Sequence, residues 1–289
     1  MRVMRNRIWV LLIGLWLLAG CKYDAQDFLP DGSAPLYEYT CEELWTSRGA
    51  NRIYGQLFTP QGVKGRMPLC IMSHGFGGTH NNAHDYSEAM AQLGYMTYAF
   101  DFCGGGNYSR SDGETTQMSV LTECDDLEAV LDYFLSRNDV DHSRICLMGD
   151  SQGGLVTALT AARRADDVER ICLFYPALNI PDMLYDYLGT LDRAPAAFPI
   201  GSVMVGNCYF ADVWPLIGRV YDEIGAFRGK VLLVQGSADT TVPLASSDKA
   251  AYEVYGAQCE YHVIAGAGHV FAGNDRRRSL TYTIRFMKQ

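Results

Sequence analysis

The sequence is poor in positive charge and lacks repetition. It holds 24 lysines and arginines against 33 aspartates and glutamates, a formal net charge of −9 at pH 7. Proteins that bind nucleic acids neutralise phosphates with basic side chains, so this balance disfavours a nucleic-acid partner. No internal repeat or low-complexity tract interrupts the 289 residues. A chain of this length can bury one large core, and α/β folds of this size are often single domains.

Metal-binding and disulfide spacings are also missing. Cys70, Cys146 and Cys172 lie inside apolar runs, which predicts buried thiols. His80 and His84 have no apparent third ligand nearby, so we interpret them as surface residues of a helix. The sequence therefore implies no metal and no organic cofactor. Disulfide pairing stays open among four other cysteines: Cys41, Cys103, Cys208 and Cys259.

No apolar run is long enough for an ordinary transmembrane helix. Residues 8–19 form a run of twelve apolar or small residues, which follows Arg2, Arg5 and Arg7. A helix needs about 20 apolar residues to span a bilayer. A basic start followed by a shorter apolar run is typical of a secretory signal peptide.

The end of this run reads Leu-Ala-Gly-Cys at residues 18–21, which resembles the lipobox of bacterial lipoproteins. We therefore expect residues 1–20 to be a signal peptide, 21–35 a tether, and 36–289 the folded domain. Cys21 would carry the lipid of an exported, membrane-anchored protein on the periplasmic or cell-surface side. The alternatives are a plain signal peptide with a chance cysteine and a buried N-terminal helix.

From residue 36 onward, strand and helix patterns alternate. This alternation predicts an α/β fold, with a mostly parallel sheet covered by helices on both faces. Residues 176–227 break the rhythm and are rich in Pro, Gly, Tyr and Asp, which indicates a lid over the strand ends where such sheets bind ligands. The expected strands are 36–46, 51–59, 69–73, 95–101, the run from 144, 169–175, 230–235 and 260–264. The expected helices are 82–93, 118–135, the segment after 151, 244–255 and one around 279–287.

Residues 149–153 read Gly-Asp-Ser-Gln-Gly, a G-x-S-x-G match. A buried strand pattern precedes the motif, and apolar residues at helical spacing follow it. This context predicts a nucleophile elbow that presents Ser151 on a tight turn, rather than an ordinary Gly/Ser turn. A Cβ at Gly149 or Gly153 would crowd such a turn.

A serine nucleophile needs a base, and the base needs a carboxylate to orient it. In this kind of fold the partners follow in the order serine, acid, histidine. Asp239 comes directly after the strand 230–235, and His269 directly after the strand 260–264. Both loops lie at strand C-termini, on the same sheet edge as the elbow. We therefore predict Ser151, Asp239 and His269 as a catalytic triad.

A glycine-rich loop, His-Gly-Phe-Gly-Gly at residues 74–78, follows the strand 69–73. Glycines let the backbone approach a substrate carbonyl closely. We expect the backbone amides of Phe76 and Gln152 to form an oxyanion hole, rather than the loop being only a glycine-rich turn.

Together these motifs resemble α/β-hydrolases, and more closely the bacterial feruloyl (cinnamoyl) esterases, which are grouped with the serine aminopeptidase-like hydrolases. The resemblance runs from about residue 52 to the C-terminus. Two features depart from the family: residues 103–110 are longer than its Gly-His-Gly turn, and Asp150 stands where many relatives have His. The resembling segments are residues 74–78, 100–102, 111–113, 150–154, 236–239 and 266–269.

The resemblance implies a serine carboxylic-ester hydrolase acting on small aryl or hydroxycinnamoyl esters. It also implies a polar pair in the lid that binds the phenolic hydroxyl of the acid, and Asp182 and Tyr209 fall at the corresponding places. Two alternatives remain: a serine exopeptidase or amidase, and a non-catalytic, lipid-anchored binding module. The peptidase alternative draws on the acidic residues of the lid: Asp182, Asp186, Asp192 and Asp212.

Overall fold

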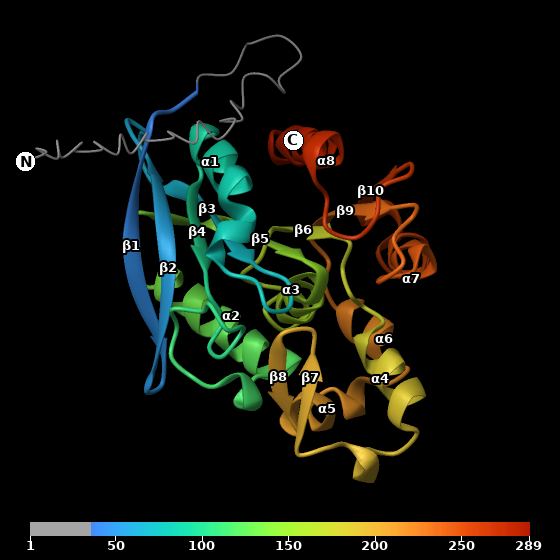
Figure 1. The fold of residues 1–289 in the computed structure, drawn as a ribbon. Coiled ribbons are helices and arrows are strands. Elements are labelled where there is room, and N and C mark those ends of the chain that lie inside the picture. Colours follow the sequence, from blue (N-terminus) through green and yellow to red (C-terminus); the bar gives the residue numbers. More distant parts are fainter. Residues whose placement is uncertain (1–35) are drawn as a thin grey trace, which may run out of the picture.

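The computed structural model describes residues 36–289, which form an eight-stranded sheet flanked by helices (Figure 1). The strand order is β1-β2-β4-β3-β5-β6-β9-β10. Neighbouring strands from β4 to β10 run parallel, while β2 pairs antiparallel with both β1 and β4. The strands are β1 (Tyr39–Arg48), β2 (Asn51–Pro60), β3 (Met67–Ser73), β4 (Met96–Phe100), β5 (Val140–Asp150), β6 (Arg170–Phe174), β9 (Lys230–Gly236) and β10 (Cys259–Ile264).

Helices cover both faces of the sheet. In Figure 1, α1 and α8 lie in the upper part of the view, and α2 and α3 lie lower. The helices are α1 (His84–Gln92), α2 (Val120–Leu135), α3 (Ser151–Arg163), α4 (Ile180–Leu188), α5 (Cys208–Ala211), α6 (Val220–Ile224), α7 (Leu244–Lys249) and α8 (Gly273–Met287). Shorter turns are η2 (His80–Ala83), η3 (Thr115–Gln117), η4 (Leu191–Arg193), η5 (Trp214–Leu216), the π-helical η6 (Ala250–Tyr255) and η7 (Gly256–Gln258). The predicted α/β architecture is confirmed.

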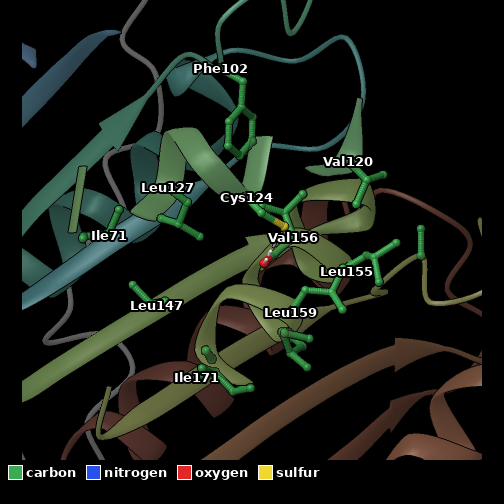
Figure 2. Close-up of a cluster of buried hydrophobic side chains, with 14 of the residues drawn as sticks. Ile71, Phe102, Val120, Cys124, Leu127, Leu147, Leu155, Val156, Leu159 and Ile171 are labelled. Carbon is green, nitrogen blue, oxygen red and sulfur yellow. Dashed lines mark hydrogen bonds between the residues drawn. The ribbon is translucent and has the colours of Figure 1, made fainter. Parts of the chain in front are cut away.

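The core consists of two layers because successive side chains of a strand point to opposite faces. Ile71, Leu147 and Ile171 pack against α2 and α3 in the cluster of Figure 2. Their chain neighbours Cys70 and Cys146 belong to the other cluster, which includes residues of α1 and α8. Strands buried on both faces read as unbroken apolar runs, which is why they were predictable.

The lid segment carries more regular structure than expected. Strands β7 (Ala197–Ile200) and β8 (Val203–Gly206) form an antiparallel hairpin within it. The hairpin lies with α4 and α5 in the lower part of Figure 1. Its strands are only four residues long, too short for an alternating pattern to stand out from their surroundings.

Helix α8 begins at Gly273, six residues before the expected start. Residues 274–278 are Asn, Asp and three arginines, so the apolar period that signals a helix is missing there. Polar contacts with another element hold this turn instead. The Arg276 guanidinium donates to both carboxylate oxygens of Asp85 on α1, at 2.5 and 2.9 Å.

The eight cysteines within residues 36–289 are all free thiols. Cys70, Cys146 and Cys172 are buried, as their strand patterns predicted. No helix in this part of the chain is both long and apolar enough to cross a bilayer. The predicted signal peptide, tether and lipidation site at Cys21 lie outside the described residues.

Candidate active site

Ser151 sits at the turn between β5 and α3 with φ = +51°. This left-handed conformation is strained for a residue with a side chain, and such strain concentrates at functional sites. The turn is tight on both sides. A Cβ at Gly149 would overlap the carbonyl oxygen of Gly153, and one at Gly153 would overlap the carbonyl oxygens of Ser73 and His74. The elbow therefore packs directly against the end of β3.

The structure brings the three predicted triad side chains together. The Ser151 Oγ lies 2.9 Å from His269 Nε2, and the His269 Nδ1 lies 2.8 Å from Asp239 Oδ2. Asp239 follows β9 and His269 follows β10, and these two strands are parallel neighbours in the sheet. Their loops therefore leave the same edge side by side, close to the elbow that follows β5.

Hydrogen bonds keep Asp239 ionised. Burial by itself would raise the pKa of this carboxyl, but the amides of Val242 and Thr241 and the ring of His269 lower the pKa below its usual value. The two amides donate to Asp239 Oδ1, each at 2.9 Å, and Gln235 Nε2 donates to Oδ2 at 3.0 Å. An ionised Asp239 holds the proton of His269 on Nδ1, which leaves Nε2 to accept the proton of Ser151.

The two predicted oxyanion donors lie beside Ser151. Phe76 and Gln152 both line the pocket that contains Ser151. Gln152 is the second residue of α3, where helix amides have no intrahelical acceptor. Within residues 36–289, the Phe76 amide donates no hydrogen bond to another backbone group. The loop is braced by the bond from the Gly77 amide to the Gly105 carbonyl, at 3.1 Å.

Ser151 and His269 open onto a pocket of about 300 Å³. Its wall is mostly apolar and comes largely from the lid. A few polar residues interrupt it, among them Asn179, Thr241 and Tyr209. The apolar wall includes Phe76, Ala177, Ile180, Met183, Leu184, Ile200, Val242 and Val270.

The structure does not bring the predicted lid pair together, and the placement of Asp182 in the pocket is wrong. Asp182 is exposed on α4 and does not line the pocket. Its Oδ1 accepts a hydrogen bond from the Gly218 amide at 2.9 Å, so its role is to fix the lid backbone. Tyr209 does line the pocket, and its hydroxyl donates to Gln152 Oε1 at 2.7 Å. Sequence order along an irregular segment could not reveal this separation.

Sequence reasoning missed Glu123 of α2. Its Oε2 accepts a hydrogen bond from Gln152 Nε2 at 2.8 Å, and its side chain is buried. The signal was present, because Glu123 falls four residues before Leu127 and seven before Val130, on the apolar stripe of the helix. An acid on such a stripe needs a specific partner.

His80 and His84 lie in different surroundings. His80 is buried, with Nδ1 2.7 Å from Asp101 Oδ1, which corrects its interpretation as a surface residue. His84 is half exposed and lies 3.6 Å from Glu88. No group of three or more His, Cys, Asp or Glu side chains within residues 36–289 is arranged to hold a metal ion.

Asp150 places a second carboxyl beside the triad. Desolvation raises its pKa to about 6, although Arg276, the Gly75 amide and His269 each favour the charged form. The folded protein therefore holds this proton more tightly than the unfolded chain does. Stability conferred by this difference is present at low pH and is lost as the pH rises through about 6.

We expect Asp150→Asn to stabilise the fold increasingly at higher pH, because the variant never ionises. One pKa unit corresponds to about 1.4 kcal/mol, so its free energy of unfolding relative to wild type should grow by about 2 kcal/mol between pH 4 and pH 8. Urea unfolding at several pH values measures this difference. A constant difference at every pH would contradict the assignment.

Segments of the chain match known proteins. The family described as "Serine aminopeptidase, S33" matches residues 66–203. A 136-residue segment is 29% identical to the alpha/beta hydrolase domain-containing protein WAV2 of Arabidopsis thaliana, covering 47% of this chain and 42% of that protein. The putative hydrolase YtaP of Bacillus subtilis is also 29% identical over 136 residues, covering 39% of this chain and 44% of that protein. The chain thus spans less than half the length of these two relatives.

Among solved structures, Est1E from Butyrivibrio proteoclasticus with bound ferulic acid superposes with a TM-score of 0.76 at 24% identity. The superposition covers 85% of this chain and 98% of Est1E. At this identity the likeness establishes the fold. The chain has the α/β-hydrolase fold.

Proposed function

We propose that the protein is a serine carboxylic-ester hydrolase. The observation that carries this proposal is the hydrogen-bonded series from Ser151 through His269 to Asp239, which opens onto an apolar pocket. A serine hydroxyl becomes a useful nucleophile only when a base takes its proton, and this arrangement provides the base and its carboxylate. A non-catalytic binding module has no need to maintain it.

The reaction proceeds in two steps. His269 takes the proton of Ser151 as its Oγ attacks the ester carbonyl, and the amides of Phe76 and Gln152 stabilise the negative oxygen. The C–O bond to the alcohol then breaks, and His269 returns the proton to the leaving alcohol. In the second step, water gives a proton to His269 and attacks the acyl-serine, which releases the acid and restores Ser151.

Serine exopeptidase or amidase activity is the second candidate, favoured by the family description that matches residues 66–203. An exopeptidase needs carboxylates in the pocket to hold a free amino terminus. Among the residues that line this pocket, Asp150 is the single carboxylate. Asp182 accepts from the Gly218 amide, and Asp212 from Ser119. This distribution favours esters.

The pocket also suggests the acyl group. An apolar slot with a few polar residues in its wall, Tyr209 among them, suits a planar aromatic acid that carries a polar substituent. We infer that small aryl or hydroxycinnamoyl esters are the substrates, with Tyr209 contacting the substituent. The fold shared with Est1E, whose structure holds ferulic acid, supports the same class.

We further propose that the protein is exported and anchored to a membrane through Cys21. The support is sequence alone: the basic start, the apolar run at residues 8–19 and the Leu-Ala-Gly-Cys segment. Residues 21–35 would then tether the hydrolase domain to the lipid.

Loss of Ser151 or His269 should abolish ester hydrolysis. We expect Ser151→Ala and His269→Ala to lower kcat by a factor of about 10⁴ to 10⁶, because triad members act as a unit. Asp239→Ala should cost less. Hydrolysis of aryl acetates gives the rates, and a fluorophosphonate probe should label wild type but not Ser151→Ala. Ser202→Ala, at an exposed lid serine, is the control. A Ser151→Ala variant that keeps a tenth of the activity would refute the mechanism.

Tyr209→Phe should reduce hydrolysis of methyl hydroxycinnamates more than that of methyl cinnamate. Because the Tyr209 proton is donated to Gln152, its oxygen can accept from a phenolic hydroxyl, and losing that bond should cost about 3–10-fold in kcat/KM. Any loss common to both esters reports on the contact with Gln152. Asp182→Ala, outside the pocket, is the control and should leave the ratio of the two esters unchanged. Equal losses on both esters would remove Tyr209 from substrate recognition.

Cys21→Ser should release the protein from stable membrane attachment. One acyl chain binds a bilayer only marginally, whereas two or three hold firmly, so attachment depends on the modified cysteine. Intact mass spectrometry of the native protein should show a diacylglyceryl group on Cys21, and detergent partitioning should follow it. A native protein that begins at an unmodified Met1 or Cys21 would reject this proposal.

A further inference from the structure

Three buried polar side chains link the lid to the nucleophile elbow. Tyr209 lies on α5, Gln152 on α3 and Glu123 on α2, and each is at most 4% exposed. The Tyr209 hydroxyl donates to Gln152 Oε1 at 2.7 Å, and Gln152 Nε2 donates to Glu123 Oε2 at 2.8 Å. The oxygen and the nitrogen of the Gln152 amide are therefore both engaged, which fixes its orientation.

Within residues 36–289, the carboxyl at the end of this series forms no ion pair with a lysine or arginine. Its Oε1 has no hydrogen-bond partner among the residues that the structure describes. The ionisable groups around it are Asp126 and Cys124 on α2 and Tyr209 on α5. Of these groups, Asp126 forms an ion pair with Arg48, at 2.5 Å.

These surroundings favour the neutral form of Glu123 over its anion. Burial raises its pKa well above the ordinary value, the hydrogen bond from Gln152 opposes this only in part, and the charge of Asp126 raises the pKa further. A carboxyl whose pKa is raised in this way holds its proton to a higher pH than an exposed carboxyl does.

We propose that Glu123 is a positioning residue of the hydrolase site, a neutral acceptor that fixes Gln152 and, through it, the oxyanion amide and the Tyr209 wall. This inference rests on the proposed ester hydrolysis. The side chain and the backbone amide of Gln152 share one Cα. A side chain held at one end by Glu123 and Tyr209 therefore restrains the peptide whose N–H must face the substrate carbonyl.

The neutral state matters as much as the hydrogen bond. An anion at Glu123 would lie one side chain away from the amide that stabilises the negative oxygen, and in a buried site such repulsion is poorly screened. Ionisation of Glu123 at alkaline pH should therefore oppose the reaction. A glutamine at this position would accept the same bond from Gln152 and could never ionise.

The test compares Glu123→Gln with Glu123→Met. Steady-state kcat and KM for an aryl acetate are measured from pH 6 to 10, with spontaneous hydrolysis subtracted, beside the rate at which a fluorophosphonate labels Ser151. At pH 7 we expect Glu123→Gln to stay within about threefold of wild type, whereas Glu123→Met should lower kcat about 3–10-fold with a smaller change in KM. Above neutral pH, wild-type kcat and labelling rate should fall while those of Glu123→Gln persist.

The matched control is Glu128→Gln, on the same helix, where Glu128 pairs with Arg163 at 3.2 Å on a partly exposed surface. It should follow wild type at every pH. A Glu123→Gln variant that keeps the alkaline decline, or loses as much kcat as Glu123→Met, would overturn the inference. If Glu123→Met does not fold, as thermal unfolding would show, the isosteric glutamine variant decides alone. A wild type that neither hydrolyses esters nor labels at Ser151 rejects the hydrolase proposal and this inference with it.

Discussion

The site depends on the close packing of the β5–α3 turn against the end of β3. Gly153 leaves no room for a Cβ beside the carbonyl oxygens of Ser73 and His74. This contact therefore fixes the position of two segments relative to each other. One is the turn with the strained backbone of Ser151, and the other is the start of the loop that contains Phe76. A looser turn would separate Ser151 from the proposed oxyanion donors, and displacements of about 1 Å are costly in active sites.

The parallel sheet supplies the remaining groups. Since neighbouring parallel strands end at the same edge, the loops after β9 and β10 emerge together and bring Asp239 to His269. The amides of Thr241 and Val242 donate to Asp239 and stabilise its negative charge. The proposed triad thus follows from strand order, with Ser151 and His269, 118 positions apart, meeting at 2.9 Å.

The lid contributes part of the pocket wall, and buried hydrogen bonds connect it to the elbow. Tyr209, Gln152 and Glu123 form a buried polar series between α5, α3 and α2. Buried polar networks are costly when partly satisfied, and the unpartnered Oε1 of Glu123 shows that this one is not fully satisfied. Its place next to the proposed oxyanion donor Gln152 fits a requirement of the proposed site better than a source of stability. On the outer side of the lid, Asp182 only braces the backbone at Gly218.

The sequence by itself determined the alternation of strands and helices, the elbow around Ser151 and the order of Asp239 and His269. These features are local: a buried strand reads as an apolar run, and an elbow needs glycines at fixed offsets. Only the tertiary structure decided which polar residues of the lid face the pocket, because exposed and pocket-facing residues alternate there without a period. It also decided the start of α8, where the ion pair of Arg276 with Asp85 replaces an apolar stripe, and the role of Glu123. These three features depend on contacts with segments distant in the sequence. A local sequence pattern does not indicate which distant segment will make the contact.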